Sequence, residues 1–104
     1  MIKMSVFYPK TQNSRFDIDY YCNQHIALVR EKLGAALKGV AVEHGLAGGT
    51  PGSPPLYAAM GHLYFDTVES FLNAFEPNAG AIVADVPNYT NVEPIIQISE
   101  VKLK

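Results

Sequence analysis

The segment LYAAMGHLYF, residues 56–65, restricts the possible folds more than any other part of the chain. It is too short to cross a membrane and lies between a Pro-rich loop and Asp66, which is typical of a β-strand. The side chains on both faces of this strand are apolar, with His62 as the exception. A strand that is apolar on both faces needs cover on both sides of its sheet. The sequence therefore predicts a sheet with a layer of helices on one side and a second cover on the other.

The other elements follow from hydrophobic periodicity and from turn residues. Alternating side chains before Pro9 indicate a first strand, and an amphipathic pattern that ends at Gly34 indicates a helix. A loop rich in Gly and Pro separates two further strands. The predicted elements are strand 1–8, helix 18–33, strand 37–46, strand 56–65, helix 66–75, a short helical segment at 79–86 and strand 92–103.

Local signals mark the ends of the two main helices. Asp17 is placed to cap the first helix, and the periodic pattern puts Cys22 on its apolar side. Asp66 and Glu69 have the spacing of a capping box at the start of the second helix. Pro77 is expected to end that helix.

The order strand–helix–strand–strand–helix–strand is that of a ferredoxin-like sandwich, an α+β fold with an antiparallel sheet and helices on one face. The chain of 104 residues has the length of one such domain, which we assign to residues 1–104. These helices can cover only one face of strand 56–65. A second copy of the sheet is the simplest cover for the other face, so we predict a homodimer.

Composition indicates which partners and which cellular compartment to expect. The chain is 48% hydrophobic and 17% charged, as expected for a packed domain. Its 8 basic and 10 acidic residues form no basic stripe, so neither nucleic acid nor a membrane surface is a predicted partner. The single cysteine, Cys22, leaves no internal disulfide and fits a reducing compartment. Because no signal-peptide pattern is present, we expect a cytoplasmic protein.

His25 is the first candidate functional residue because it occupies the apolar face of helix 18–33. A histidine in such a position is commonly a core residue that a neighbouring group satisfies by a hydrogen bond. Histidine is also the side chain best suited to proton transfer near neutral pH, which makes His25 a candidate catalytic acid or base. His62 is a candidate for the same pocket. The tyrosines whose hydroxyls are candidates for holding a flat, oxygen-bearing ligand are Tyr8, Tyr21, Tyr64 and Tyr89.

No cofactor or metal ion is predicted. The chain has no dinucleotide-binding glycine pattern, no haem motif and no metal-ligand spacing such as His-x-x-x-His. Cys22 lies one turn before His25, but residues on adjacent turns rarely aim a thiolate well for nucleophilic attack. Packing is the simpler interpretation of this thiol.

Two segments give the chain a resemblance to a known family. FDIDYYCNQHIALV resembles the Y-Y-x-x-x-H-x-P-L segment of EthD proteins, and DVPNYTNVEPIIQISEV resembles their C-terminal strand with its preceding D-x-P-N-Y/F-T turn. The YP after the first strand and the GG…PP loop extend the resemblance over nearly the whole chain. Ala27 stands where the motif has proline, a residue that would bend the helix just after His25.

The resemblance implies the dimeric α+β barrel superfamily, in which two ferredoxin-like sheets pack together and each subunit keeps a pocket between its sheet and helices. EthD proteins are linked to degradation of small ethers and to tailoring of aromatic natural products. Wider relatives include cofactor-free monooxygenases, cyclases and isomerases. The resemblance thus implies a cofactor-independent enzyme of the oxidoreductase or isomerase type, acting on a small apolar or aromatic compound. The alternative is a non-catalytic binding or accessory module for a degradation or monooxygenase system.

Overall fold

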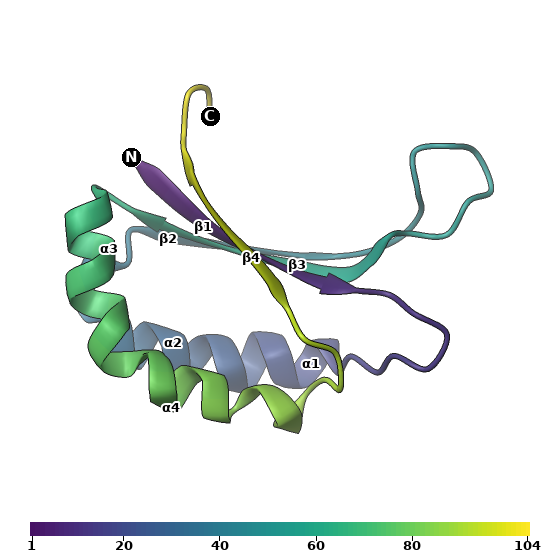
Figure 1. Ribbon diagram of the computed structural model, residues 1–104, viewed down its shortest axis with the longest axis horizontal. Coiled ribbons are helices and arrows are strands. Elements are labelled where there is room, and N and C mark those ends of the chain that lie inside the picture. Colours follow the sequence, from purple (N-terminus) through teal and green to yellow (C-terminus); the bar gives the residue numbers. More distant parts are fainter.

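The fold is a four-stranded antiparallel sheet with the helices on one of its faces (Figure 1). The computed structural model describes residues 1–104. The strand order β2-β3-β1-β4 makes β1 and β3 central and β2 and β4 the edges. This arrangement confirms the predicted ferredoxin-like α+β fold. The strands are β1 (Ile2–Pro9), β2 (Gly39–His44), β3 (Tyr57–Phe65) and β4 (Ile95–Glu100).

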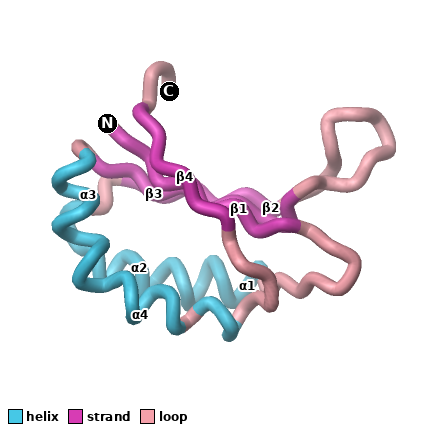
Figure 2. The backbone as a smooth tube through the Cα atoms, in the orientation of Figure 1, coloured by secondary structure: helices cyan, strands magenta, loops and turns pink.

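The helical layer consists of two long stretches beneath the sheet (Figure 2). The amide of Asn78 ties them together by donating a hydrogen bond to the carbonyl of Lys32, at 3.0 Å. The first stretch contains α1 (Ile18–Tyr20), a π-helical turn (Tyr21–His25), α2 (Ile26–Leu33) and a 3₁₀ turn (Gly34–Ala36). The second contains α3 (Val68–Phe75), a 3₁₀ turn (Glu76–Asn78), α4 (Ala79–Ala84) and a 3₁₀ turn (Val86–Asn88).

Alternation along the central strands separates the two faces of the sheet. Met4, Val6 and Tyr8 of β1 are buried on the inner face, which the helices cover. Phe65 of β3 lies on the same face and packs edge-on against Phe71 of α3, with ring centroids 5.1 Å apart. The hydrophobic core therefore lies between the inner face and the helical layer, and no helix covers the outer face.

α1 begins and α2 ends where the sequence predicts the first helix to begin and end. Asp17 accepts a hydrogen bond from the backbone N–H of Tyr20 at 3.0 Å, which satisfies one of the free amides at the helix start. Gly34 follows Leu33 with a φ of 57°, a backbone conformation that favours glycine and ends the helix.

The capping box of α3 differs from the predicted one. Thr67, whose backbone is extended, accepts from the N–H of Ser70 at 3.0 Å, and the Ser70 hydroxyl accepts from the N–H of Thr67 at 3.2 Å. The prediction that Asp66 and Glu69 form this box is therefore wrong. The helix begins one residue later than the pattern suggests, so the reciprocal pair moves by one position.

The π-helical turn changes which side chains of the first stretch are buried. The N–H of Ile26 bonds to the carbonyl of Tyr21, which makes this turn wider than an α-helical one. Tyr21 and His25 both face the sheet, 3% and 4% exposed, whereas Cys22 is exposed. The prediction that Cys22 lies on the apolar side is wrong because it assumed an uninterrupted α-helix.

Both edge strands are shorter than predicted. β2 ends at His44, and Leu46 lies in the following loop with 92% of its surface exposed. β4 begins only after Pro94, a residue that has no N–H to donate to a neighbouring strand, and it ends at Glu100.

Replacing Gly61 with alanine is expected to lower the free energy of unfolding by about 1–3 kcal/mol, the usual cost of overpacking a core. A Cβ atom at this position of β3 would collide with the hydroxyl of the buried Tyr21. Combining Gly61→Ala with Tyr21→Phe removes the colliding oxygen and should restore part of the loss. Urea unfolding of the single and double variants measures this coupling. Additive effects of the two substitutions would contradict the contact.

Candidate functional site

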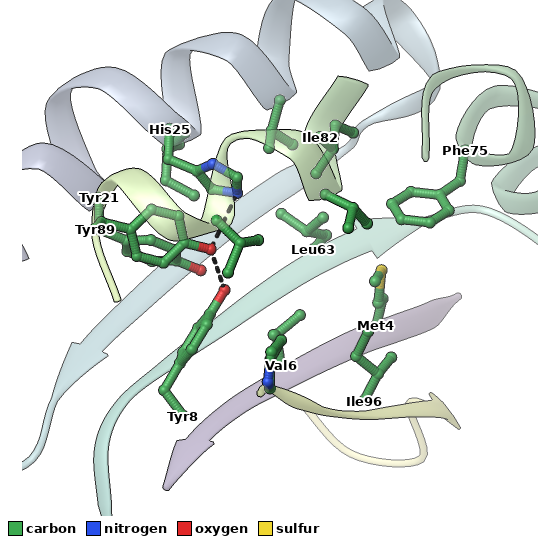
Figure 3. A pocket seen from close by; sticks show the side chains of 15 residues that line it. Met4, Val6, Tyr8, Tyr21, His25, Leu63, Phe75, Ile82, Tyr89 and Ile96 are labelled. Atoms are coloured by element: carbon green, nitrogen blue, oxygen red, sulfur yellow. Dashed lines mark hydrogen bonds between the residues drawn. The ribbon is translucent and has the colours of Figure 1, made fainter. Parts of the chain in front are cut away.

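A cavity lies between the inner face of the sheet and the helices (Figure 3). Its volume is about 60 Å³, well above the roughly 10–15 Å³ that one water molecule needs. Of its 15 lining residues, 13 are hydrophobic, so its wall is apolar except at one end. The lining residues are Met4, Val6, Tyr8, Tyr21, His25, Ile26, Val29, Leu63, Phe75, Ile82, Val83, Val86, Tyr89, Pro94 and Ile96.

His25 points into this cavity from the end of the π-helical turn (Figure 3). Its Nδ1 lies 2.8 Å from Oδ2 of Asp85, the residue that follows α4. The imidazole is 4% exposed, and burial lowers its pKa even though the hydrogen bond and the charge of Asp85 act in the opposite direction. His25 is therefore neutral at pH 7.

Asp85 is held as a carboxylate by three hydrogen-bond donors. Tyr20 and Asn88 each donate to Oδ1 at 2.8 Å, and His25 occupies Oδ2. Partial burial raises the pKa of Asp85, but the hydrogen bonds from Asn88, His25 and Tyr20 outweigh this effect, and the pKa is lowered overall. An ionised Asp85 accepts the proton of Nδ1, so the remaining ring nitrogen, Nε2, carries a lone pair on the cavity side.

Three tyrosines lie at the same end of the cavity as His25. The hydroxyls of Tyr8 and Tyr89 are hydrogen-bonded at 2.7 Å, and the Tyr89 hydroxyl lies 3.5 Å from Nε2 (Figure 3). The ring of Tyr21 stacks on the imidazole, with centroids 5.4 Å apart and an angle of 17° between the planes. Burial raises the pKa of each of these tyrosines, so all three hydroxyls stay protonated.

The structure brings together four of the six residues predicted for the site. His25, Tyr8, Tyr21 and Tyr89 line one end of the cavity although they come from three separate parts of the chain. Tyr89 is fully buried, at the end of the turn that precedes β4.

The prediction that His62 and Tyr64 line the same pocket is wrong. They alternate along β3 with Leu63, which faces the cavity, so both point to the outer face of the sheet. There His62 joins a separate hydrogen-bonded chain, in which its Nδ1 lies 3.0 Å from the Ser5 hydroxyl and its Nε2 lies 3.1 Å from Glu43.

The partner of His25 is the residue that sequence reasoning missed. The apolar face of the helix that carries His25 has no acidic residue, so the pattern of this helix indicates no partner for the histidine. Asp85 lies 60 positions further along the chain and reaches the imidazole only through the packing of α4 against the first helical stretch. The available signal was the D-x-P-N-Y turn, whose first residue is Asp85 and whose last is Tyr89.

The structure contains neither a cluster of potential metal ligands nor a helix that could span a membrane. No group of three or more His, Cys, Asp or Glu side chains is arranged to hold a metal ion. No helix has both the length and the apolar character needed to cross a bilayer.

Residues 11–93, which include the histidine and its aspartate partner, match the EthD domain. The chain belongs to the EthD family. The structure is similar to that of an EthD-like protein of Ralstonia eutropha JMP134, with a TM-score of 0.94 and 42% sequence identity over 99% of this chain and 93% of that one. Among curated proteins, none matches the chain.

More distant EthD and ferredoxin-like structures share the fold alone. An ethyl tert-butyl ether d (EthD) family protein of Bacillus halodurans C-125 has a TM-score of 0.69 and 21% identity, over 97% of this chain and 98% of that one. A dimeric protein of unknown function from Bacteroides fragilis, with a ferredoxin-like fold, has a TM-score of 0.53 and 11% identity, over 96% and 95%.

Acid is expected to weaken the EthD fold through His25. Because burial lowers the pKa of His25 below its ordinary 6.5, the unfolded chain takes up this proton first as the pH falls. The contribution to stability is complete above about pH 6.5 and is lost below it, with a slope of at most about 1.4 kcal/mol per pH unit. Urea unfolding between about pH 7 and pH 5 should show a flatter pH dependence for His25→Leu than for the wild type. Equal slopes would contradict a lowered pKa.

Proposed function

We propose that this EthD protein is a cofactor-independent enzyme in which His25 transfers protons to and from a small, mainly apolar compound. The observation that carries the proposal is the orientation of His25, whose Nε2 faces the cavity while Nδ1 is fixed by Asp85. An imidazole that is neutral and has one free lone pair is a competent base at pH 7.

Asp85 gives this histidine two properties that a core histidine lacks. By accepting the Nδ1 proton it fixes the tautomer, and its negative charge stabilises the imidazolium that forms when Nε2 takes a proton. Nε2 can then return the proton to another atom of the bound compound. Proton transfer of this kind serves isomerisation and cyclisation directly, and it can also generate the electron-rich anion that a cofactor-free oxidation requires.

The cavity wall indicates the kind of compound that fits. Most of the lining is aliphatic or aromatic, while the hydroxyl groups and Nε2 are gathered at one end. Such a site favours a small apolar or aromatic molecule with a polar atom at one end.

A binding or accessory role is the second candidate function, because the same cavity could hold such a compound for a partner oxidase without chemistry. The two functions differ in one measurable respect, which is whether the isolated protein converts a bound compound. Degradation of small ethers is one process that either role would serve.

We further propose that the protein is a cytoplasmic homodimer, joined through the outer face of the sheet. No helix covers this face, and its partly buried side chains include Phe7, Met60 and Tyr64. A second sheet would cover them in the way that the helices cover the inner face.

Substitution of His25 tests whether the protein is an enzyme that uses this histidine as its base. His25→Asn is expected to lower kcat/KM by about 10²–10⁴-fold, because it removes the general base while keeping a polar group of similar size. Asp85→Asn should also lower kcat, since the tautomer and the imidazolium both lose their support. His44→Asn is the control, because His44 is exposed on β2. The assay follows binding and turnover of small ethers and aromatic compounds by NMR.

The outcome of His25→Leu decides between catalysis and packing. Leucine needs no hydrogen-bond partner and could raise the melting temperature. A higher melting temperature with unchanged binding and turnover would show that His25 is a core residue, and the proposal would be wrong. If compounds bind to the wild type and none is converted, the accessory role replaces the enzyme.

Light scattering should give a mass near twice the 11.4 kDa of one chain. The dimer is expected to bury more than about 1,200 Å² of surface, as stable interfaces do. Met60→Glu places a charge on the outer face and should yield monomers, whereas Arg30→Glu on the exposed side of α2 should not. A wild-type monomer at micromolar concentration would contradict the proposed assembly.

A further inference from the structure

The hydroxyl groups of Tyr8 and Tyr89 carry two hydrogens, but only one of these hydrogens forms a hydrogen bond of ordinary length. Tyr8 and Tyr89 are both protonated, and a single hydrogen bond of 2.7 Å joins their oxygens. Nε2 of His25 has no hydrogen and can only accept, and its neighbour is the Tyr89 hydroxyl at 3.5 Å. The hydrogen of Tyr89 therefore points at Nε2, and Tyr8 is the donor in the bond between the two hydroxyls. The distance from Tyr89 to Nε2 is long for an O–H donor, for which about 2.7–2.8 Å is usual.

The hydrogen bond from Tyr89 to His25 is therefore weaker than the one from Tyr8 to Tyr89. An oxygen atom of a bound compound could accept the Tyr89 hydrogen without breaking the bond between the two tyrosines. The same compound would then lie next to Nε2, because Tyr89 and Nε2 adjoin each other at one end of the cavity (Figure 3). A hydrogen-bond donor beside a base is the arrangement that stabilises an oxyanion formed by loss of a proton.

We propose that the substrate is a neutral carbonyl compound, that His25 removes a proton from the carbon next to its carbonyl group, and that Tyr89, supported by Tyr8, holds the resulting enolate oxygen. This inference rests on the proposed function and specifies its substrate class and its first chemical step.

The step is balanced without an oxidant or a cofactor. The C–H bond next to the carbonyl breaks, and its proton forms an N–H bond at Nε2 of His25. The electron pair of that C–H bond forms a carbon–carbon double bond, and the carbonyl π electrons move to the oxygen, which accepts the hydrogen bond from Tyr89. Reprotonation from Nε2 at another carbon gives isomerisation, and reprotonation at the same carbon gives exchange once the Nε2 hydrogen has been replaced from the solvent. Attack of the enolate on a second carbonyl of the same molecule gives cyclisation, and the alkoxide so formed takes the proton from Nε2.

The charges of the site favour a neutral substrate over an anionic one. Asp85 lies behind His25 and is ionised, and His25 itself is neutral. No lysine or arginine lines the cavity, so a substrate carboxylate would be buried without a counter-ion. A negative charge is stabilised only once the proton has reached Nε2, when the imidazolium stands beside the enolate.

Hydrogen exchange tests this step without knowledge of the natural substrate. The wild-type protein is incubated in D₂O with cyclopentanone, cyclohexanone or acetophenone, and deuterium at the carbon next to the carbonyl is followed by NMR. Binding of each ketone is measured on the same samples by saturation transfer, with ethylbenzene as an analogue of acetophenone that has no carbonyl group. We expect exchange above the buffer rate for at least one ketone that binds.

Three substitutions assign the roles. His25→Asn should abolish the exchange, and Tyr89→Phe should slow it by about 10²–10³-fold, the usual effect of losing one oxyanion donor. Tyr89→Phe keeps the buried ring, so the circular dichroism spectrum should be unchanged. The melting temperature should fall, because the buried Tyr8 hydroxyl loses its partner, and exchange is therefore measured well below it. Tyr64→Phe is the matched control, because this tyrosine lies on the outer face of the sheet, and it should exchange at the wild-type rate.

The possible failures are distinguishable. Exchange that needs His25 and is unaffected by Tyr89→Phe would overturn the enolate inference and leave the proposed role of His25 standing. If ketones bind and no exchange occurs, the enolate inference is wrong. The proposed function would then be tested by whether the protein converts any other compound and whether that turnover needs His25. Exchange that survives His25→Asn would overturn both.

Discussion

The hydrogen bond between His25 and Asp85 is the interaction on which the site depends. It joins the first helical stretch to the turn after α4, so it fixes how the two halves of the helical layer meet. Buried polar groups are costly unless they are paired, and here every buried side-chain nitrogen and oxygen has a partner. The pair determines which nitrogen of His25 faces the cavity, and with it the direction in which the site can move a proton.

The π-helical turn is the local feature that makes this pairing possible. It places the ring of Tyr21 against the imidazole and sends Cys22 to the surface. Gly61 leaves room on β3 for the Tyr21 hydroxyl, so a small residue in the sheet and a wide turn in the helix act on the same side chain. π-Helical turns are frequent at functional sites, because the extra residue re-aims the side chains of one turn.

The sequence predicts the order of elements and the fold because both follow from local periodicity and turn residues. The same reasoning assigns His25, Tyr8, Tyr21 and Tyr89 to one site. It fails where the result depends on the exact winding or the exact first residue of a helix. The π-helical turn moves Cys22 to the surface, and the later start of α3 shifts its capping box by one residue. Because β3 is apolar on both faces, its pattern does not reveal which set of side chains faces the helices, and the sequence does not show that His62 lies on the outer face. Asp85 could not be paired with His25 from local pattern alone, since their contact exists only after the helices pack.

The protonation state of His25 is the central claim, and long-range ¹H–¹⁵N NMR of the imidazole measures it most directly. The chemical shifts of the two ring nitrogens show which of them carries the proton. At neutral pH the structure predicts a neutral ring with its proton on Nδ1, facing Asp85, and a bare Nε2 facing the cavity. A ring that is doubly protonated at pH 7, or that carries its single proton on Nε2, would contradict the account.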